Sequence, residues 1–208
     1  PVKPIATGEG GAVTTADAEL ARRVRLFRNH GITSDHRQRE AVGAHRYEMV
    51  ALGYNYRLSD IQCALGISQL SKLPGWVVRR QAIAGRYDAA FAGIEPLRTR
   101  AGCSHARHLY VVRCDAARLG VGRDEIFTAL RRAGIGSNVH YPPVHVHPFY
   151  RERFGTRPGL CPQAEAAYDA ILSLPIFPGM QDVDVHDVID RLLAAAVHGG
   201  GQRIRKTA

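Results

Sequence analysis

The sequence predicts an α/β protein, and three observations lead to that prediction. From residue 108 onward, short apolar runs typical of strands alternate with segments whose apolar residues have helical spacing. Capping signals and glycine or proline stops delimit those helices. The chain has 208 residues, of which 45% are hydrophobic and 23% charged, and this suits one large domain or two small ones.

The chain begins with Pro1-Val2-Lys3, followed by the apolar pair Ile5-Ala6 and a glycine-rich turn from Thr7 to Gly11. We expect Ile5 and Ala6 to form a buried strand, while the glycines permit close approach of another group to the backbone. A lysine at the mouth of such a strand would be desolvated, which makes its amine a usable nucleophile. Taken alone, the stretch also fits a surface lysine at a frayed terminus.

The rest of the first half predicts helices with few strands. Residues 12–14 read as a short strand, and Thr14 with Asp17 gives a capping signal for a helix over 16–29. The polar residues 33–49 predict a surface loop. Ser59 and Gln62 form a capping box for a helix that Pro74-Gly75 should break. This helix is apolar around much of its circumference, so we expect it to be buried, with a subunit interface as one reading.

The second half predicts a small α/β or α+β domain. Residues 76–92 predict a helix that connects two domains. The remaining elements are strands at 108–114, 135–141 and 174–177 and helices at 123–133, at 162–172 and from 182 onward. We therefore predict a first domain over 1–75, a second over 76–198, and a disordered tail over 199–208. Because the first half has too few strands to cover its helices, we expect the chain to be a fragment.

Charge and cysteine usage narrow the class of protein. The net charge of +9 makes a non-catalytic basic domain that binds nucleic acid or another anionic polymer the alternative reading. The arginines, however, are spread along helices, and a small anion such as a nucleotide sugar explains a basic site equally well. Four separated cysteines without a Cys-x-x-Cys pair predict reduced, mostly buried thiols in a cytoplasmic protein. No run of residues has membrane-spanning length, and no secretory signal pattern is present.

Two further stretches carry candidate site residues. Asn55 and Arg57 flank Tyr56 just before the capped helix, where an amide and a guanidinium can bind phosphate; a turn residue and a surface charge are the alternatives. The second stretch, from His140-Tyr141 through Pro142-Pro143 to His145 and His147, is rich in histidine. No carboxylate or cysteine lies near it in sequence, so a rigid polar loop that lines a pocket is expected there and no metal.

Several motifs in order resemble one known family, the nucleotide-sugar aminotransferases of the DegT/StrS type. The resemblance covers Pro1 to about His198 and rests on residues 1–11, Arg28 to Gly31, Gly53 to Gln62, His108 to Tyr110, Gly134 to Tyr141 and Leu172 to Pro175. It implies a fold-type-I enzyme that uses pyridoxal 5'-phosphate (PLP), usually a homodimer. This chain would hold the C-terminal part of the large domain and the small α+β domain.

The resemblance also implies roles for residues. Lys3 matches the lysine that holds the cofactor covalently and moves the catalytic proton. Asn55 matches a residue that reaches the cofactor phosphate of the neighbouring subunit, and Arg57, beside Tyr56, matches a position near the substrate diphosphate. The wall of the substrate pocket would contain His140, Tyr141 and His145.

The implied reaction gives an amino group, usually from L-glutamate, to a UDP-linked 4-keto-6-deoxy sugar. Lysine at position 3 argues against the related dehydratases, which have histidine there. The family's upstream residues, which hold the cofactor ring and phosphate, are missing from this chain. The 208 residues alone are therefore expected not to bind the cofactor tightly and not to turn over.

Overall fold

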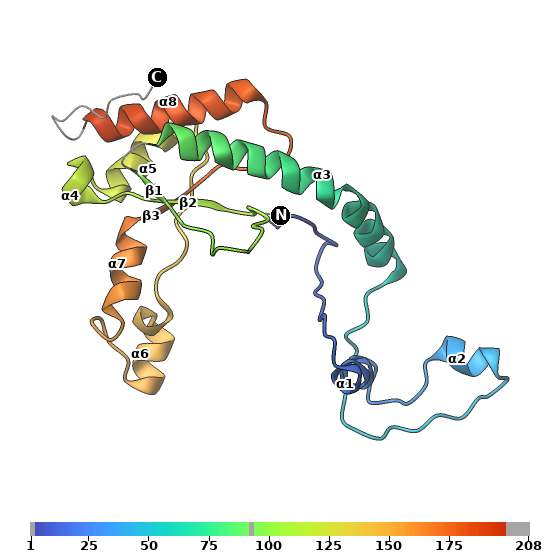
Figure 1. Cartoon of the computed structure of the whole chain (residues 1–208). Coiled ribbons are helices and arrows are strands. Elements are labelled where there is room, and N and C mark those ends of the chain that lie inside the picture. Colours follow the sequence, from blue (N-terminus) through green and yellow to red (C-terminus); the bar gives the residue numbers. More distant parts are fainter. Residues whose placement is uncertain (1–2, 92–93, 199–208) are drawn as a thin grey trace. The chain divides into compact units, whose positions relative to one another are not determined.

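The computed structural model describes residues 3–91 and 94–198, and these residues form two compact units (Figure 1). The first unit is Ile5–Lys72; the second consists of Lys3, Pro4 and the described residues from Leu73 onward. The tail that we expect to be disordered, residues 199–208, lies outside the described residues. Each unit is described by itself.

The first unit is helical. Helix α1 is Ala18–Arg28, and its N-cap is Asp17, whose carboxylate accepts the amides of Glu19 and Leu20 at 2.9 and 3.0 Å. This confirms the predicted helix, with the cap at Asp17 instead of Thr14. Helix α2, His36–Ala41, lies in the segment that we expect to be a loop. Its start is fixed by a capping box between Asp35 and Gln38.

The strands expected at Ile5-Ala6 and at residues 12–14 are not formed, so both predictions are wrong. Instead of pairing with a strand, the backbone amide of Ala6 donates to the side chain of Gln69 at 3.0 Å. A strand needs a partner to satisfy its amides and carbonyls, and the first unit supplies no sheet for these segments.

Two glycines bring distant segments of the first unit together. Residues 28–31 lie antiparallel to residues 53–56, with a β-bridge between Asn29 and Asn55. Gly31 has φ +69°, and a Cβ there would collide with the carbonyl of Ala51; a Cβ on Gly53 would collide with the backbone of Gly31. Glycine is therefore required at both positions.

The first unit exposes most of its apolar side chains. Helix α1 contains no buried residue, and Gly31 is the one buried residue among residues 5–72. The helix that begins at Asp60 was expected to be buried, yet within this chain Ile61 is 84% exposed and Ile67 72%. In this unit the helix lacks a layer of structure to pack against, and the prediction of burial is wrong for the chain by itself.

Helix α3 is continuous from Asp60 to Ala90 and therefore belongs to both units. The prediction that Pro74-Gly75 breaks the helix is wrong. Proline lacks the N–H that would bond to Leu70, and its ring crowds that carbonyl, but a helix can pass such a position at a local cost. The boundary between the two units also lies near this proline, since the first unit ends at Lys72 and the second resumes at Leu73.

The second unit contains an antiparallel sheet in the order β1-β2-β3. Its strands are β1 (Glu95–Pro96), β2 (Tyr110–Arg113) and β3 (Ile171–Leu174). The strand predicted over 174–177 thus lies a few residues earlier, since Pro175 has no amide to continue the pairing. The strand predicted over 135–141 is reduced to a single bridge between Asn138 and Ser173, so that prediction is wrong for most of its length.

Helices cover one face of this sheet. Besides the second half of α3, the unit contains α4 (Ala116–Leu119), α5 (Arg123–Arg132), a 3₁₀ turn (Val144–Val146), α6 (Pro148–Phe154), α7 (Pro162–Ala170) and α8 (Asp182–His198). The predicted helices at 123–133, at 162–172 and from 182 are confirmed within a few residues. The mixture of helices and antiparallel strands confirms the expected fold class.

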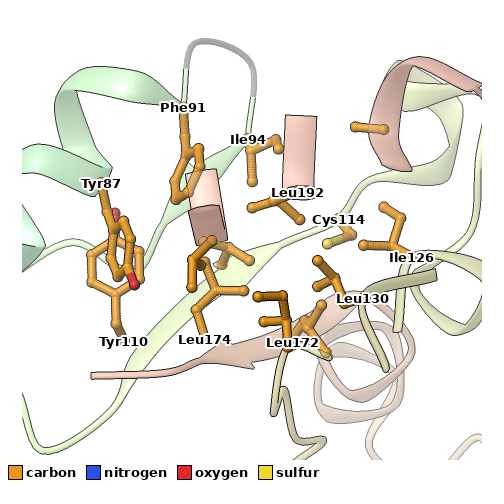
Figure 2. Close-up of a cluster of buried hydrophobic side chains, with 14 of the residues drawn as sticks. Tyr87, Phe91, Ile94, Tyr110, Cys114, Ile126, Leu130, Leu172, Leu174 and Leu192 are labelled. Carbon is orange, nitrogen blue, oxygen red and sulfur yellow. The ribbon is translucent and has the colours of Figure 1, made fainter. Parts of the chain in front are cut away.

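The hydrophobic core lies between the sheet and helices α3, α5 and α8 (Figure 2). Tyr110 pairs with Leu174 and Val112 with Leu172, and all four side chains are buried. The helical side of this core contains Ile83, Tyr87, Ile126, Leu130, Val185 and Leu192. Full burial of each such aliphatic side chain contributes about 1.5–3 kcal/mol. The second unit therefore has the core that the first unit lacks.

Three of the four cysteines, Cys63, Cys103 and Cys161, are exposed, and only Cys114 is buried. The prediction of mostly buried thiols is therefore wrong, although all four are free. Burial raises the pKa of the Cys114 thiol to about 11. None of the helices in the described residues is both long and apolar enough to cross a membrane.

Candidate active site

Lys3 belongs to the second unit, with the sheet and the loop that leads into β2. Its side chain is exposed, so the expected desolvation at the mouth of a buried strand is not found. Lys3 is nonetheless close enough to His108 for its charge to lower the pKa of that imidazole. The structure thus assigns the candidate nucleophile to the same unit as β2.

His108 is the point at which several basic groups converge. Burial is the main cause that lowers the pKa of this half-buried imidazole, followed by electrostatic interactions with Lys3, His105, Arg80 and His140. A lowered pKa keeps His108 neutral at pH 7. Two of these neighbours, Lys3 and Arg80, are cationic side chains, and their positive charge favours an anionic ligand near His108.

Arg80, on α3, anchors the loop that carries His108. Its guanidinium is buried, and Nη1 donates to the carbonyl of Ile176 at 2.7 Å and to that of Arg107 at 3.1 Å. Backbone carbonyls thus bind Nη1 without a carboxylate, while the buried Nε has no hydrogen-bond partner among the described residues. The position of His108 is therefore fixed by the core of the unit.

His140 lies on the face of the sheet opposite the core. Its Nδ1 is 2.7 Å from the hydroxyl of Ser173, whose neighbours Leu172 and Leu174 point into the core. Successive residues of a strand alternate between faces, so Ser173 and His140 share the other face. The ring of Tyr141 meets that of His140 edge-on, with centroids 4.7 Å apart, and Tyr141 is exposed. His140 and Tyr141 can both meet a ligand on this face.

His145 has a different environment. Its ring is buried, and Nε2 is 2.7 Å from Oε1 of Glu165 on α7. Glu165 also accepts the amide of Gly159 at 2.8 Å, and the pKa of its carboxyl is lowered, first by the hydrogen bond from His145. The contact that the structure gives His145 thus joins the 3₁₀ turn to α7. A contact of His145 with substrate stays a prediction. Within the described residues, no group of three or more His, Cys, Asp or Glu could hold a metal ion.

Asn55, Tyr56 and Arg57 lie in the first unit, just before α3. The amide of Tyr56 donates to the carbonyl of Arg28 at 2.9 Å, and Tyr56 stacks on Tyr54 with ring centroids 5.0 Å apart. Arg57 Nη1 donates to Oδ1 of Asn29 at 2.6 Å. Ser59 and Gln62 cap the helix that follows, as predicted.

An open cleft of about 550 Å³ lies in the second unit, between α3 and the loop before β2. Its lining is mainly polar and includes Gln81, Asp88, His105 and Arg107. None of the seven residues that the sequence proposes for the site lines this cleft. His105, which lines this cleft, also contributes to the lowered pKa of His108.

The structure thus places Lys3, His140, Tyr141 and His145 in the second unit, and Asn55, Tyr56 and Arg57 in the first. Sequence reasoning did not assign His108, Ser173, Asn29 or Glu165 to a site. His108, Ser173 and Asn29 lie within motifs that carry the family resemblance, namely His108 to Tyr110, Leu172 to Pro175 and Arg28 to Gly31. Membership of these motifs is the feature of the sequence that could have pointed to them. Glu165 had no signal, because its partner is 20 residues away.

An exposed lysine in a unit of helices and antiparallel strands, with further basic side chains in that unit, fits the class of enzymes that act on anionic substrates. Residues 1–193 match the DegT/DnrJ/EryC1/StrS aminotransferase family, and the chain belongs to that family. It is 43% identical over 193 residues to the spore coat polysaccharide biosynthesis protein SpsC of Bacillus subtilis, with 90% of this chain and 50% of that protein covered.

Solved structures support the same assignment. The chain is similar to Helicobacter pylori PseC, an aminotransferase involved in the biosynthesis of pseudoaminic acid, with a TM-score of 0.79 and 32% identity over 94% of this chain and 51% of PseC. It also matches the PLP form of the putative sugar aminotransferase Spr1654 from Streptococcus pneumoniae, with a TM-score of 0.74 and 28% identity over 91% and 46%. The chain spans about half the length of the curated relatives that it matches.

Proposed function

We propose that the protein that contains this chain is a PLP-dependent aminotransferase of nucleotide-sugar biosynthesis. The reaction transfers the amino group of L-glutamate to the keto carbon of a UDP-linked 4-keto-6-deoxy sugar. The observation that carries the proposal is the match of residues 1–193 to the aminotransferase family, in a chain whose candidate lysine, Lys3, is exposed. The enzyme acts in the cytoplasm, where nucleotide sugars are made.

The residues of the second unit fit a phosphorylated, anionic cofactor. Lys3 has an accessible side chain, and the cationic side chains of Lys3 and Arg80 act electrostatically on His108. When bound, PLP supplies an electron-withdrawing ring that stabilises negative charge on the carbon that loses its proton. Lys3 Nζ would hold the cofactor and would act as the base and acid for the proton that the reaction moves. His140 and Tyr141, on the open face of the sheet, bind the sugar, and His145 supports their loop through Glu165.

The first unit supplies contacts to anionic groups. The Asn55 amide would donate to the cofactor phosphate, Arg57 would bind the diphosphate of the nucleotide sugar, and Tyr56 would contact the substrate beside it. In the homodimer that we propose, these residues serve the site of the second copy. Exposed Ile61 and Ile67 on α3 are apolar side chains that such a partner would cover.

The particular reaction proposed is that of UDP-4-amino-4,6-dideoxy-N-acetyl-β-L-altrosamine transaminase, as in pseudaminic acid biosynthesis. The similarity to PseC supports this choice, and so does the accessible histidine and tyrosine pair at positions 140 and 141. The two rings give a polar, adaptable wall that suits the hydroxyl and acetamido groups of such a sugar.

The test uses the full-length protein with PLP, L-glutamate and the UDP-linked 4-keto-6-deoxy sugar, and follows the amino sugar by mass spectrometry. We expect product with the wild type, and a loss of at least about a thousandfold in Lys3→Ala, since both the covalent hold and the proton carrier are removed. Lys72→Ala, at the exposed lysine of α3, is the matched control and should keep its activity. Product formation by Lys3→Ala at the wild-type rate would refute the assignment.

A further inference from the structure

The side chain of Asn29 holds the guanidinium of Arg57. Arg57 Nη1 donates to Oδ1 of Asn29 at 2.6 Å, across 28 residues of sequence. No carboxylate forms an ion pair with Arg57 anywhere in the described part of the chain. A hydrogen bond from a charged donor to a neutral amide oxygen orients the guanidinium while it keeps its full positive charge.

The backbone beneath this contact is fixed independently. Asn29 and Asn55 form an antiparallel bridge, and the amide of Tyr56 donates to the carbonyl of Arg28 at 2.9 Å. The amide of His30 donates to the carbonyl of Tyr54 at 3.0 Å. The place of Asn29 opposite Asn55 is therefore set by backbone bonds that a change of its side chain leaves intact. The side chain is free to serve Arg57.

We infer that Asn29 is a positioning residue for anion recognition by Arg57. This inference rests on the proposed function, in which Arg57 binds the diphosphate of the nucleotide sugar. Arginine has a long side chain with many rotamers, and ordering it on binding costs affinity. A residue that orders the guanidinium before the ligand arrives reduces that cost. An aspartate in place of Asn29 would order it too, but would also neutralise the charge that the diphosphate needs.

The experiment compares Asn29→Ala, Asn29→Asp and Arg57→Ala in the full-length enzyme. In Asn29→Ala we expect the KM for the nucleotide sugar to rise about 3- to 10-fold with kcat little changed, as for the loss of one hydrogen bond to a charged group. Thr33→Ala is the control: Thr33 is exposed, and its side chain makes no hydrogen bond within the described residues. It should leave KM unchanged.

A second readout measures order directly. In uniformly ¹⁵N-labelled protein, we expect the backbone to stay paired in both Asn29 variants, and protection of the Tyr56 amide from exchange checks this pairing. The Nε–H order parameter of Arg57 should fall in Asn29→Ala to that of exposed Arg25, and should recover in Asn29→Asp while KM stays high. If Asn29→Asp restores the order of the Arg57 side chain but not the low KM for the nucleotide sugar, a purely structural role of Asn29 does not explain the result.

The outcomes separate this inference from the proposed function. If Arg57→Ala raises KM but Asn29→Ala changes neither KM nor the mobility of Arg57, the positioning role is refuted and the diphosphate contact stands. If Arg57→Ala leaves KM unchanged, Arg57 does not contact the substrate, and both the contact and the role of Asn29 toward it are overturned.

Discussion

At the scale of single residues, Gly31 permits the close pairing of residues 28–31 with the segment that carries Asn55 to Arg57. Gly31 has a left-handed backbone, and a Cβ there would collide with the carbonyl of Ala51. Gly43 also has a left-handed backbone, with φ +64°, but its Cβ would meet open space. Substitutions at Gly31 and Gly43 therefore distinguish the cost of a left-handed backbone from the cost of a steric collision.

We expect Gly43→Ala to cost only the left-handed penalty, about 1–2 kcal/mol. Gly31→Ala adds the collision and should separate residues 28–31 from 50–56. Exchange of the Val50 amide, which donates to the carbonyl of Gly31 at 2.9 Å, reports on this pairing. Protection of that amide should be lost in Gly31→Ala and kept in Gly43→Ala. Equal protection in both variants would show that the segment relaxes around the new methyl group.

At the scale of elements, Glu165 joins α7 to the segment that follows His140 and Tyr141. Its carboxylate accepts hydrogen bonds from the ring of His145 and from the amide of Gly159. The hydroxyl of Thr156 donates to the carbonyl of His145 at 2.7 Å. These bonds fix the 3₁₀ turn and α6 with few apolar contacts, since α6 contains no buried residue. The position of the segment that follows His140 and Tyr141 therefore depends on the carboxylate of Glu165.

Glu165→Ala should release this loop at pH 7, so that the amide of Gly159 exchanges as fast as an exposed loop amide. Because the pKa of Glu165 is lowered, its contribution is present above its ordinary value of 4.5 and is lost as the pH falls through the lowered value. The amide shift of Gly159 should titrate with a midpoint below 4.5 in the wild type and not at all in Glu165→Gln. A midpoint at or above 4.5 would contradict the contact.

Elements differ in how far the sequence predicts them. Helices at 123–132 and 182–198 follow from local signals, the acidic first turn and the regular apolar spacing, and the structure confirms them. Strands at 12–14 and 135–141 need a partner that local sequence does not show, and they were predicted wrongly. Helix α3 shows the opposite error, since a proline is a local signal that the long helix overrides. Boundaries set by tertiary contacts are not readable from neighbours in sequence.

The site was predictable where motifs carry it. Lys3 and His140 were proposed from the sequence, whereas the hydrogen bond that anchors the loop before β2 through Arg80 depends on the fold. The ring of His145 was expected in the pocket wall, but its partner Glu165 depends on how α7 packs. Contacts between residues that are far apart in sequence require the fold.

At the scale of the whole molecule, burial is divided unequally between the two units. Every buried hydrophobic side chain of the core belongs to residues 83–196, whereas the first unit exposes Leu20, Phe27 and Ile61. Stability of a domain arises mainly from apolar burial set against chain entropy. The second unit should therefore fold without the first, while the first should not fold without a surface to cover it.

This difference can be measured on separate pieces of residues 73–198 and 5–72. We expect the longer piece to unfold in one cooperative thermal transition with dispersed amide resonances, since its helices α3, α5 and α8 keep the whole core. The shorter piece should show partial helix content and no cooperative transition. As a control, Leu130→Ala should lower the stability of the longer piece by about 2–5 kcal/mol, because Leu130 is fully buried. A cooperative transition in the 5–72 piece would show that its pairing around Gly31 and Gly53 suffices without a core.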